Sequence, residues 1–114
     1  FDFYWESSAE RGFVEVKGVT LEEDGVVRFP DAPTLRGVKH LQELEEARRA
    51  GYRTAVCFVI QMENVSWFEP NDRTHPAFGA ALRNAAEAGV EVLAMECRVT
   101  PEELLPGRPV PVRL

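Results

Sequence analysis

The sequence predicts one α/β domain built on a mixed β-sheet that helices flank on both faces. Segments rich in β-branched and aromatic residues alternate with two segments of helical spacing. Their order is βββαβαβ, with a possible last strand, and this order needs both antiparallel and parallel pairs. The chain has 114 residues, of which 45% are hydrophobic, and this is enough for a single core.

The first three strands are predicted at residues 1–6, 12–23 and 24–29. A polar turn joins the first two strands as a hairpin. Asp24-Gly25 is a turn signal that brings the third strand back onto the second. We therefore expect three consecutive antiparallel strands.

Two helices follow. The first is predicted from Leu35 to Ala50, with Thr34 as its N-cap and Gly51 after its end. The second begins near Pro76 and ends before Gly89. The apolar residues that recur at core spacing are Val38, Leu41 and Leu44 in the first helix, and Phe78, Ala81, Leu82 and Ala85 in the second.

The remaining strands are apolar. Residues 54–60 form an unbroken apolar run, which is typical of a parallel strand covered on both faces. Residues 90–99 predict another central strand. Residues 109–114 can only form an edge strand, because their prolines cannot donate to a ladder.

Charge and cysteine usage narrow the function classes. The net charge of -6 would repel a polyanion such as nucleic acid, which disfavours that class of partner. A local basic face can nevertheless occur on a protein whose net charge is negative. No apolar run approaches the ~20 residues of a membrane span, so no membrane association is expected. Cys57 and Cys97 each lie in an apolar strand and predict buried, reduced thiols in a cytoplasmic protein. The oligomeric state stays open.

Glu15 and Lys17 are the first candidate site residues. Side chains two apart on a strand share a face, opposite to Val14 and Val16. Such a pair alone is most often a solvated strand face. Asp2, on the preceding strand, could approach it across the hairpin. Two converging carboxylates can hold Mg²⁺, and Lys17 could orient a bound water or neutralise a phosphate.

Nearly the whole chain resembles the sugar fermentation stimulation protein A family. The matching segments are "FVEVKGVTL", "FPDAPTLRGVKHLQEL", "AVCFVIQM", "FEPNDRTHPAFGAAL" and "GVEVLAMECRV", and "FPDAPTLRGVKHL" is the most specific. The resemblance implies a nuclease-like domain of restriction-endonuclease-like, PD-(D/E)XK architecture spanning residues 1–114. It also implies a preceding OB-fold domain that is absent here, and the abrupt apolar start at Phe1 agrees with a fragment.

The resemblance also implies roles for the site residues. Asp2 and Glu15 take the two acidic positions that bind Mg²⁺ or Mn²⁺, and Lys17 takes the lysine position. Gly18 departs from the pattern, in which a small polar residue is expected after the lysine. The fold implies phosphodiester hydrolysis, and the family name implies DNA binding linked to sugar use.

Five further residues are candidates with open alternatives. Asp31 is either a third acidic group near the metal or a turn-forming aspartate. Arg36, Lys39 and His40 begin a helix, whose N-terminus favours anions, and either hold a substrate phosphate or form a solvated first turn. Gln61 ends a central strand and either contacts substrate or caps the loop.

Three functions are compatible with these features. The first is a metal-dependent endonuclease that acts on DNA. The second is a catalytically silent DNA-binding domain that regulates sugar metabolism. The third, ranked last, is a structural role in which residues 109–114 add as an edge strand to a second copy.

Overall fold

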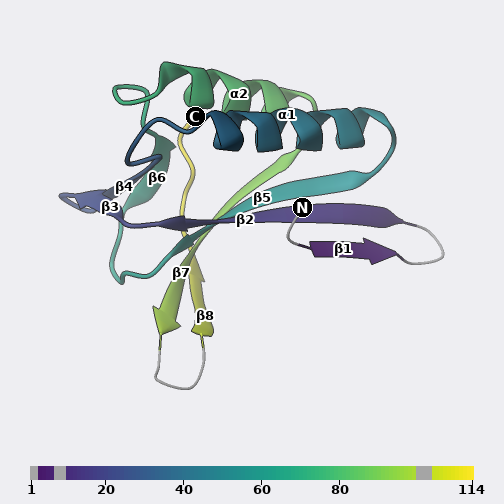
Figure 1. Cartoon of the computed structure of the whole chain (residues 1–114). Coiled ribbons are helices and arrows are strands. Elements are labelled where there is room, and N and C mark those ends of the chain that lie inside the picture. The colour runs from purple at the N-terminus through teal and green to yellow at the C-terminus, as the bar shows by residue number, and fades with distance from the viewer. Residues whose placement is uncertain (1–2, 7–9, 100–103) are drawn as a thin grey trace.

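The structure, a computed structural model, describes residues 3–6, 10–99 and 104–114. It has a mixed α/β fold with two sheets and two helices (Figure 1). The elements in chain order are β1 (Phe3–Glu6), β2 (Arg11–Val19), β3 (Leu21–Glu23), β4 (Val26–Phe29), α1 (Leu35–Arg49), β5 (Arg53–Ile60), β6 (Trp67–Pro70), α2 (Pro76–Glu87), β7 (Glu91–Val99) and β8 (Leu104–Pro109).

The larger sheet has the strand order β1-β2-β5-β7-β8. Its three central strands, β2, β5 and β7, are parallel to one another. The outer strands β1 and β8 run antiparallel to their neighbours. The mixed sheet expected from the element order is therefore present.

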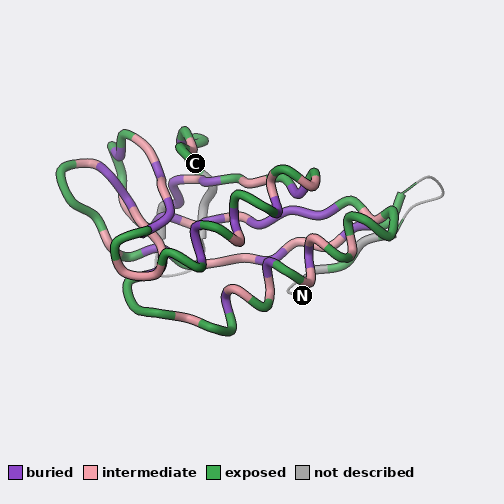
Figure 2. Tube along the Cα trace, turned by 90° about the horizontal axis from the view of Figure 1, so that it is seen from above, coloured by how far each residue is buried: buried purple, intermediate pink, exposed green. Residues whose placement is uncertain are grey.

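Both helices lie on the same face of this sheet, side by side (Figures 1 and 2). The prediction of helices on both faces is wrong. The chain crosses from β2 to β5 through α1, and from β5 to β7 through α2, and both steps go in the same direction across the sheet. Right-handed crossovers that step in one direction place their helices on one face.

The start of the chain follows the prediction with one change. The β1–β2 hairpin is present, with Tyr4 opposite Phe13. The expected second strand breaks at Thr20, and its last part, β3, pairs with β4 across Asp24 and Gly25. Both turn residues have positive φ, 51° and 85°, as a tight hairpin turn requires. Strands β3 and β4 therefore leave the main sheet.

The smaller sheet contains a strand that the sequence pattern did not indicate. Strand β6 pairs in parallel with β4, and its four residues are too few to establish an alternation. The last strand was predicted at residues 109–114 and lies instead at Leu104–Pro109. Residues beyond it make a single bridge, between Val112 and Phe68 of β6.

The helix ends agree with the local signals. The Thr34 side chain accepts a hydrogen bond from the Gly37 N–H at 2.9 Å and caps α1. Gly51, with φ 101°, follows the end of α1. Pro76 is the first residue of α2, and Gly89, with φ 105°, follows its end.

The core lies between the two helices and the sheet. Phe58 of β5 is fully buried at its centre and stacks on Phe68 with ring centroids 4.2 Å apart. Phe29 and Phe78 complete the aromatic contacts of Phe58. The helices contribute the buried side chains Leu41, Leu44, Phe78, Leu82 and Ala85.

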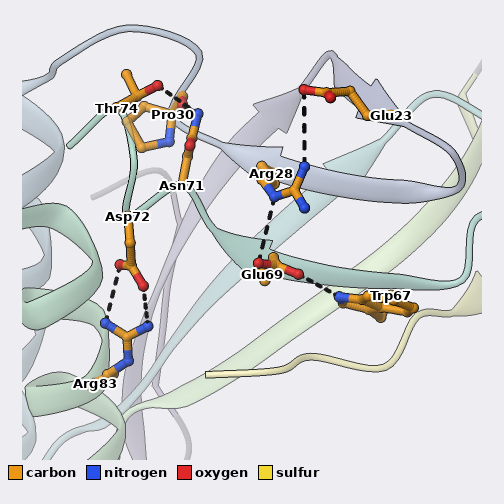
Figure 3. A network of polar contacts seen from close by, with 9 residues as sticks. All are labelled: Glu23, Arg28, Pro30, Trp67, Glu69, Asn71, Asp72, Thr74 and Arg83. Atoms are coloured by element: carbon orange, nitrogen blue, oxygen red, sulfur yellow. Dashed lines mark hydrogen bonds and ion pairs between the residues drawn. The ribbon is translucent and has the colours of Figure 1, made fainter. Parts of the chain in front are cut away.

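Polar contacts join the small sheet and the loops before the helices (Figure 3). Arg28 of β4 lies 3.5 Å from Glu69 of β6. The buried Asn71 side chain donates to the Pro30 carbonyl and to the Thr74 hydroxyl, both at 2.9 Å. Asn71 therefore ties the segment before α1 to the segment before α2.

Glu96 is a buried carboxylate on β7. It accepts hydrogen bonds from the Val65 N–H at 3.0 Å and from Arg108 at 2.9 Å. Burial acts to raise the pKa of Glu96, but these hydrogen bonds outweigh it and hold the pKa below the usual 4.5. The ionised side chain thus connects β7 to the segment before β6 and to β8.

Within the part of the chain that the structure describes, neither helix has the length and apolar character needed to cross a membrane.

The core predicts a large effect for Phe58→Ala. We expect the substitution to lower the free energy of unfolding by about 3–5 kcal/mol, because it leaves a cavity among three aromatic rings, those of Phe29, Phe68 and Phe78. Urea titration followed by circular dichroism measures the change. Leu35→Ala, at a side chain that is 83% exposed, is the control and should stay within about 0.5 kcal/mol of wild type. Equal effects would contradict this account of the core.

The low pKa of Glu96 predicts a pH-dependent contribution to stability. Because the pKa is lower in the folded state, ionised Glu96 stabilises the fold fully above about pH 4.5, and this contribution is lost as the pH falls through the folded-state pKa. Glu96→Gln should therefore destabilise the protein at pH 7 and differ less from wild type at pH 3. Denaturant titrations at both pH values test this, with Glu87→Gln on the exposed side of α2 as the control.

Candidate functional site

Glu15 and Lys17 point to the helix-covered face of β2. Glu15 is only 5% exposed, and Lys17 is mostly buried with it. The two side chains share a face, as their spacing predicted, but this face is not the solvated one. Val14 and Val16 consequently lie on the face that the helices leave uncovered.

His40 of α1 joins this pair. Its Nδ1 lies 2.8 Å from Glu15 Oε1, and the Lys17 Nζ lies 3.3 Å from the same oxygen. Lys17 Nζ and His40 Nδ1 are 2.8 Å apart. We name these three residues the Glu15 cluster. It combines a carboxylate, an ammonium group and an imidazole, and opposite charges satisfy the buried carboxylate.

The loops before the helices fix His40 over β2. The Thr34 N–H donates to His75 Nδ1 at 3.2 Å, so the N-cap of α1 is tied to the N-cap of α2. A Cβ on Gly37 would meet the Phe78 ring at 3.2 Å and Thr34 at 2.8 Å. The absence of that Cβ lets the first turn of α1 close against α2.

The neighbours of His40 place opposing demands on its Nδ1 atom. Glu15 Oε1 can only accept, so its 2.8 Å contact requires a proton on Nδ1. The Lys17 ammonium can only donate, so its 2.8 Å contact requires Nδ1 to accept. A neutral ring makes one of these two hydrogen bonds. Because Lys17 can donate to Glu15 Oε1 at 3.3 Å instead, we expect the Nδ1–H tautomer, in which His40 and Lys17 both donate to Glu15.

The sequence analysis predicted His40 as a phosphate-binding residue and missed its contact with Glu15. A signal for the contact exists in the sequence. Gly37, His40, Leu41 and Leu44 recur at helical spacing, and the other three are buried in α1. A histidine within that stripe faces the sheet.

The other predicted residues lie around or outside the cluster. Arg36 is exposed and reaches it only through His40. Lys39 is exposed and lies 4.0 Å from Glu43. Gln61 is exposed immediately after β5, and Asp31 is exposed in the loop before α1. Asp2 lies outside the described residues.

The Glu15 cluster contains one carboxylate that could bind a divalent cation. Glu15 supplies oxygen ligands of the kind that Ca²⁺ and Mg²⁺ prefer. Across the described ranges, no three side chains from Asp, Glu, His and Cys form a group that could hold a metal ion, so Asp31 does not join Glu15 and His40 in one. The residues described thus fit a cation only if a further acidic ligand joins Glu15.

A separate pocket of about 690 Å³ lies at the opposite end of the parallel strands. Three of its charged residues pair with one another: Arg53 lies 3.0 Å from Glu91 and 3.6 Å from Glu10. The pocket does not include the Glu15 cluster. It therefore adds nothing to the candidate chemistry.

The cysteines differ in burial. Cys97 is buried as predicted, but Cys57 is half-buried on the uncovered face of β5. Both are free thiols, and burial raises the pKa of each. A raised pKa keeps a thiol protonated and unreactive as a nucleophile.

Comparison with known proteins identifies the family. A profile described as the sugar fermentation stimulation protein RE domain matches residues 1–103. The chain belongs to the sugar fermentation stimulation protein family. The resemblance seen in the sequence is therefore confirmed.

Individual relatives agree with this assignment. A sugar fermentation stimulation protein homolog of Desulfitobacterium hafniense is 55% identical over 114 residues, which are 100% of this chain and 50% of that protein. A homolog of Clostridium acetobutylicum is 57% identical over 100 residues, 87% of this chain and 44% of that protein. The chain spans about half the length of the curated relatives it matches.

The fold is similar to that of a solved family member. The structure of Pyrococcus furiosus SfsA in complex with Ca²⁺ matches with a TM-score of 0.90 and 32% sequence identity. The match covers 99% of this chain and 49% of that one. The mixed α/β fold is thus the fold of this family.

The contacts predict opposite tautomers for the two histidines of the chain. His40 should carry its proton on Nδ1, and His75 on Nε2, because His75 Nδ1 accepts from the Thr34 N–H. Long-range ¹H–¹⁵N NMR spectra at a pH where both rings are neutral distinguish the two forms. Glu15→Met, which removes the acceptor, should shift His40 toward the Nε2–H form and leave His75 unchanged. An Nε2–H form of His40 in wild type would contradict this prediction and assign His40 Nδ1 as the acceptor of a hydrogen bond from Lys17.

Proposed function

We propose that this domain is a metal-dependent phosphodiester hydrolase of the PD-(D/E)XK type that acts on DNA. One observation carries the proposal: the buried Glu15 carboxylate and the Lys17 ammonium lie 3.3 Å apart on one face of a central strand. A buried ion pair costs desolvation energy and adds little stability. Its burial beside a helix that begins with basic residues is better explained by chemistry than by stability.

The proposed second acidic ligand is Asp2. In β1 and β2, Phe3 stands opposite Val14 and Tyr4 opposite Phe13. Asp2 directly precedes β1 in the sequence, and β1 pairs with β2, the strand that carries Glu15. This chain order supports proposing Asp2 and Glu15 as ligands of one ion.

The proposed cofactor is a divalent cation, Mg²⁺ or Mn²⁺. Support comes from the oxygen chemistry of Glu15 and from the Ca²⁺ complex of the Pyrococcus furiosus relative. Such an ion, when bound, stabilises charge on a phosphoryl oxygen and lowers the pKa of a coordinated water. Asp31 is retained as a candidate third acidic group on the loop before α1.

Each of the remaining candidate site residues has a proposed role. Lys17 balances the charge that builds on the phosphate and orients the attacking water. His40 holds the Glu15 carboxylate in place rather than binding DNA, because its Nδ1 is engaged by Glu15. Arg36 and Lys39, both exposed on the first turns of α1, hold neighbouring phosphates, and Gln61 contacts substrate at the end of β5.

A catalytically silent DNA-binding domain linked to sugar metabolism is the second candidate. The observation that favours it is the double occupation of Glu15 Oε1, which both His40 and Lys17 contact. A cation that used this oxygen would have to compete with two donors. In this case DNA binding would need no metal and would yield no products.

Cleavage assays with the full-length protein distinguish the two. With Mn²⁺ and duplex DNA, Lys17→Ala should lower the cleavage rate at least about 100-fold, the scale typical of losing a proton-transfer or charge-stabilising group. Arg49→Ala removes a positive charge at the far end of α1, where Arg49 lies 3.5 Å from Glu45, and should cleave like wild type.

Binding measured in the same samples completes the test. Under the hydrolase proposal, Lys17→Ala still binds DNA, and binding weakens with added salt. Metal-independent binding by wild type with no products over many hours would reject hydrolysis and favour the silent domain.

A further inference from the structure

The face of the main sheet opposite the helices is apolar across its three central strands. The register places Val16, Cys57 and Leu93 in one row, and Gly18, Val59 and Met95 in the next. Neither row contains a charged side chain. We name these two rows the open face.

The open face is exposed in part. Leu93, on β7 at one side of the face, is 47% exposed, and Val16, Cys57, Val59 and Met95 are half-buried. Neither helix lies over it, since both occupy the other side of the sheet (Figure 1). Parallel strands occur almost only in sheets whose two faces are both covered. An exposed row of Val, Cys, Leu and Met on three parallel strands therefore indicates a missing partner.

We propose that the open face is the docking surface for the other half of the full-length polypeptide. The curated relatives are about twice as long as this chain, which matches 50% of the first and 44% of another. The solved relative has the same proportion, 49%. A second half of similar size is thus part of the same molecule in these proteins, and a tethered partner acts at high effective concentration.

The size of the open face favours a tethered partner over a second copy. Three strands at a spacing of ~4.8 Å and two rows of residues ~6.6 Å apart along them give a patch of roughly 200 Å². Stable complexes between separate proteins bury ~800 Å² per partner. Interfaces between domains of one chain begin near 600 Å² in total, or about 300 Å² per side. In addition, two copies with a net charge of -6 each would repel.

The polar border defines the chemistry of the partner. At the amino ends of β5 and β7, Arg53 donates to Glu91 at 3.0 Å and closes the apolar region. The docking element should therefore present an apolar centre of aliphatic or aromatic side chains, with polar groups toward the Arg53–Glu91 end. Such a partner would shield the Cys57 thiol.

Alkylation of Cys57 in the full-length protein tests the proposal. The wild-type protein and Leu93→Lys are treated with N-ethylmaleimide, and peptide mass spectrometry follows Cys57. Leu93→Lys should weaken docking and speed Cys57 alkylation at least tenfold. Because Cys57 pairs with position 93, Leu93→Glu is tested beside it: its carboxylate disfavours the Cys57 thiolate, so it should speed alkylation only by weakening docking. Acceleration by the lysine alone would report its charge and count against docking. Leu35→Lys places the same charge at a more exposed leucine on α1 and should leave the rate unchanged.

Two further measurements test whether the variants are folded and whether the protein forms a dimer. Hydrogen exchange of the α1 and α2 amides should stay as slow in Leu93→Lys as in wild type, and Met95→Lys is the replacement variant if it does not. Cys57 alkylation that neither lysine accelerates, in folded protein, would overturn the proposal. Sedimentation that shows a concentration-dependent dimer, lost in Leu93→Lys, would assign the open face to a second copy and overturn it as well.

Discussion

The arrangement depends on one constraint, the direction in which the chain crosses its sheet. Both crossovers step from β2 toward β7, and their shared handedness places α1 and α2 on one side. One face of the central strands is therefore covered by helices and the other is not. Glu15 and Lys17 of β2 are covered by α1, whereas Val16, which lies between them in the sequence, is left on the open face. The candidate site and the proposed docking surface follow from the same topology.

Burial of Glu15 imposes a second requirement, because a carboxylate removed from water must be paired. Lys17, on the same strand, provides one partner. His40 of α1, 23 residues after Lys17 in the sequence, provides the other. The His40 contact depends on where α1 begins. The start of α1 is fixed by the Thr34 cap and by the Thr34–His75 hydrogen bond. It is also fixed by Asn71, which donates to the Pro30 carbonyl in the loop before α1. Features remote from the chemistry thus hold the carboxylate in a defined orientation.

Local signals predicted much of the fold. Thr34, Gly51, Pro76 and Gly89 set the helix ends, because capping and positive φ are properties of a few adjacent residues. Asp24-Gly25 set the β3–β4 turn for the same reason. The break at Thr20 and the short strand β6 were not predicted. Both depend on which strands meet in the smaller sheet, and a four-residue strand carries no periodicity of its own.

The sequence by itself determined the two helices, the longer strands, the family and the fact that Glu15 and Lys17 share a face, since these depend on local spacing or on matching segments. Only the tertiary structure decided which face that is, that His40 completes the cluster, and that an apolar face is left open. Strand alternation fixes which side chains lie together but not which side the helices cover. That choice depends on the direction of the crossovers, which joins residues far apart in the chain.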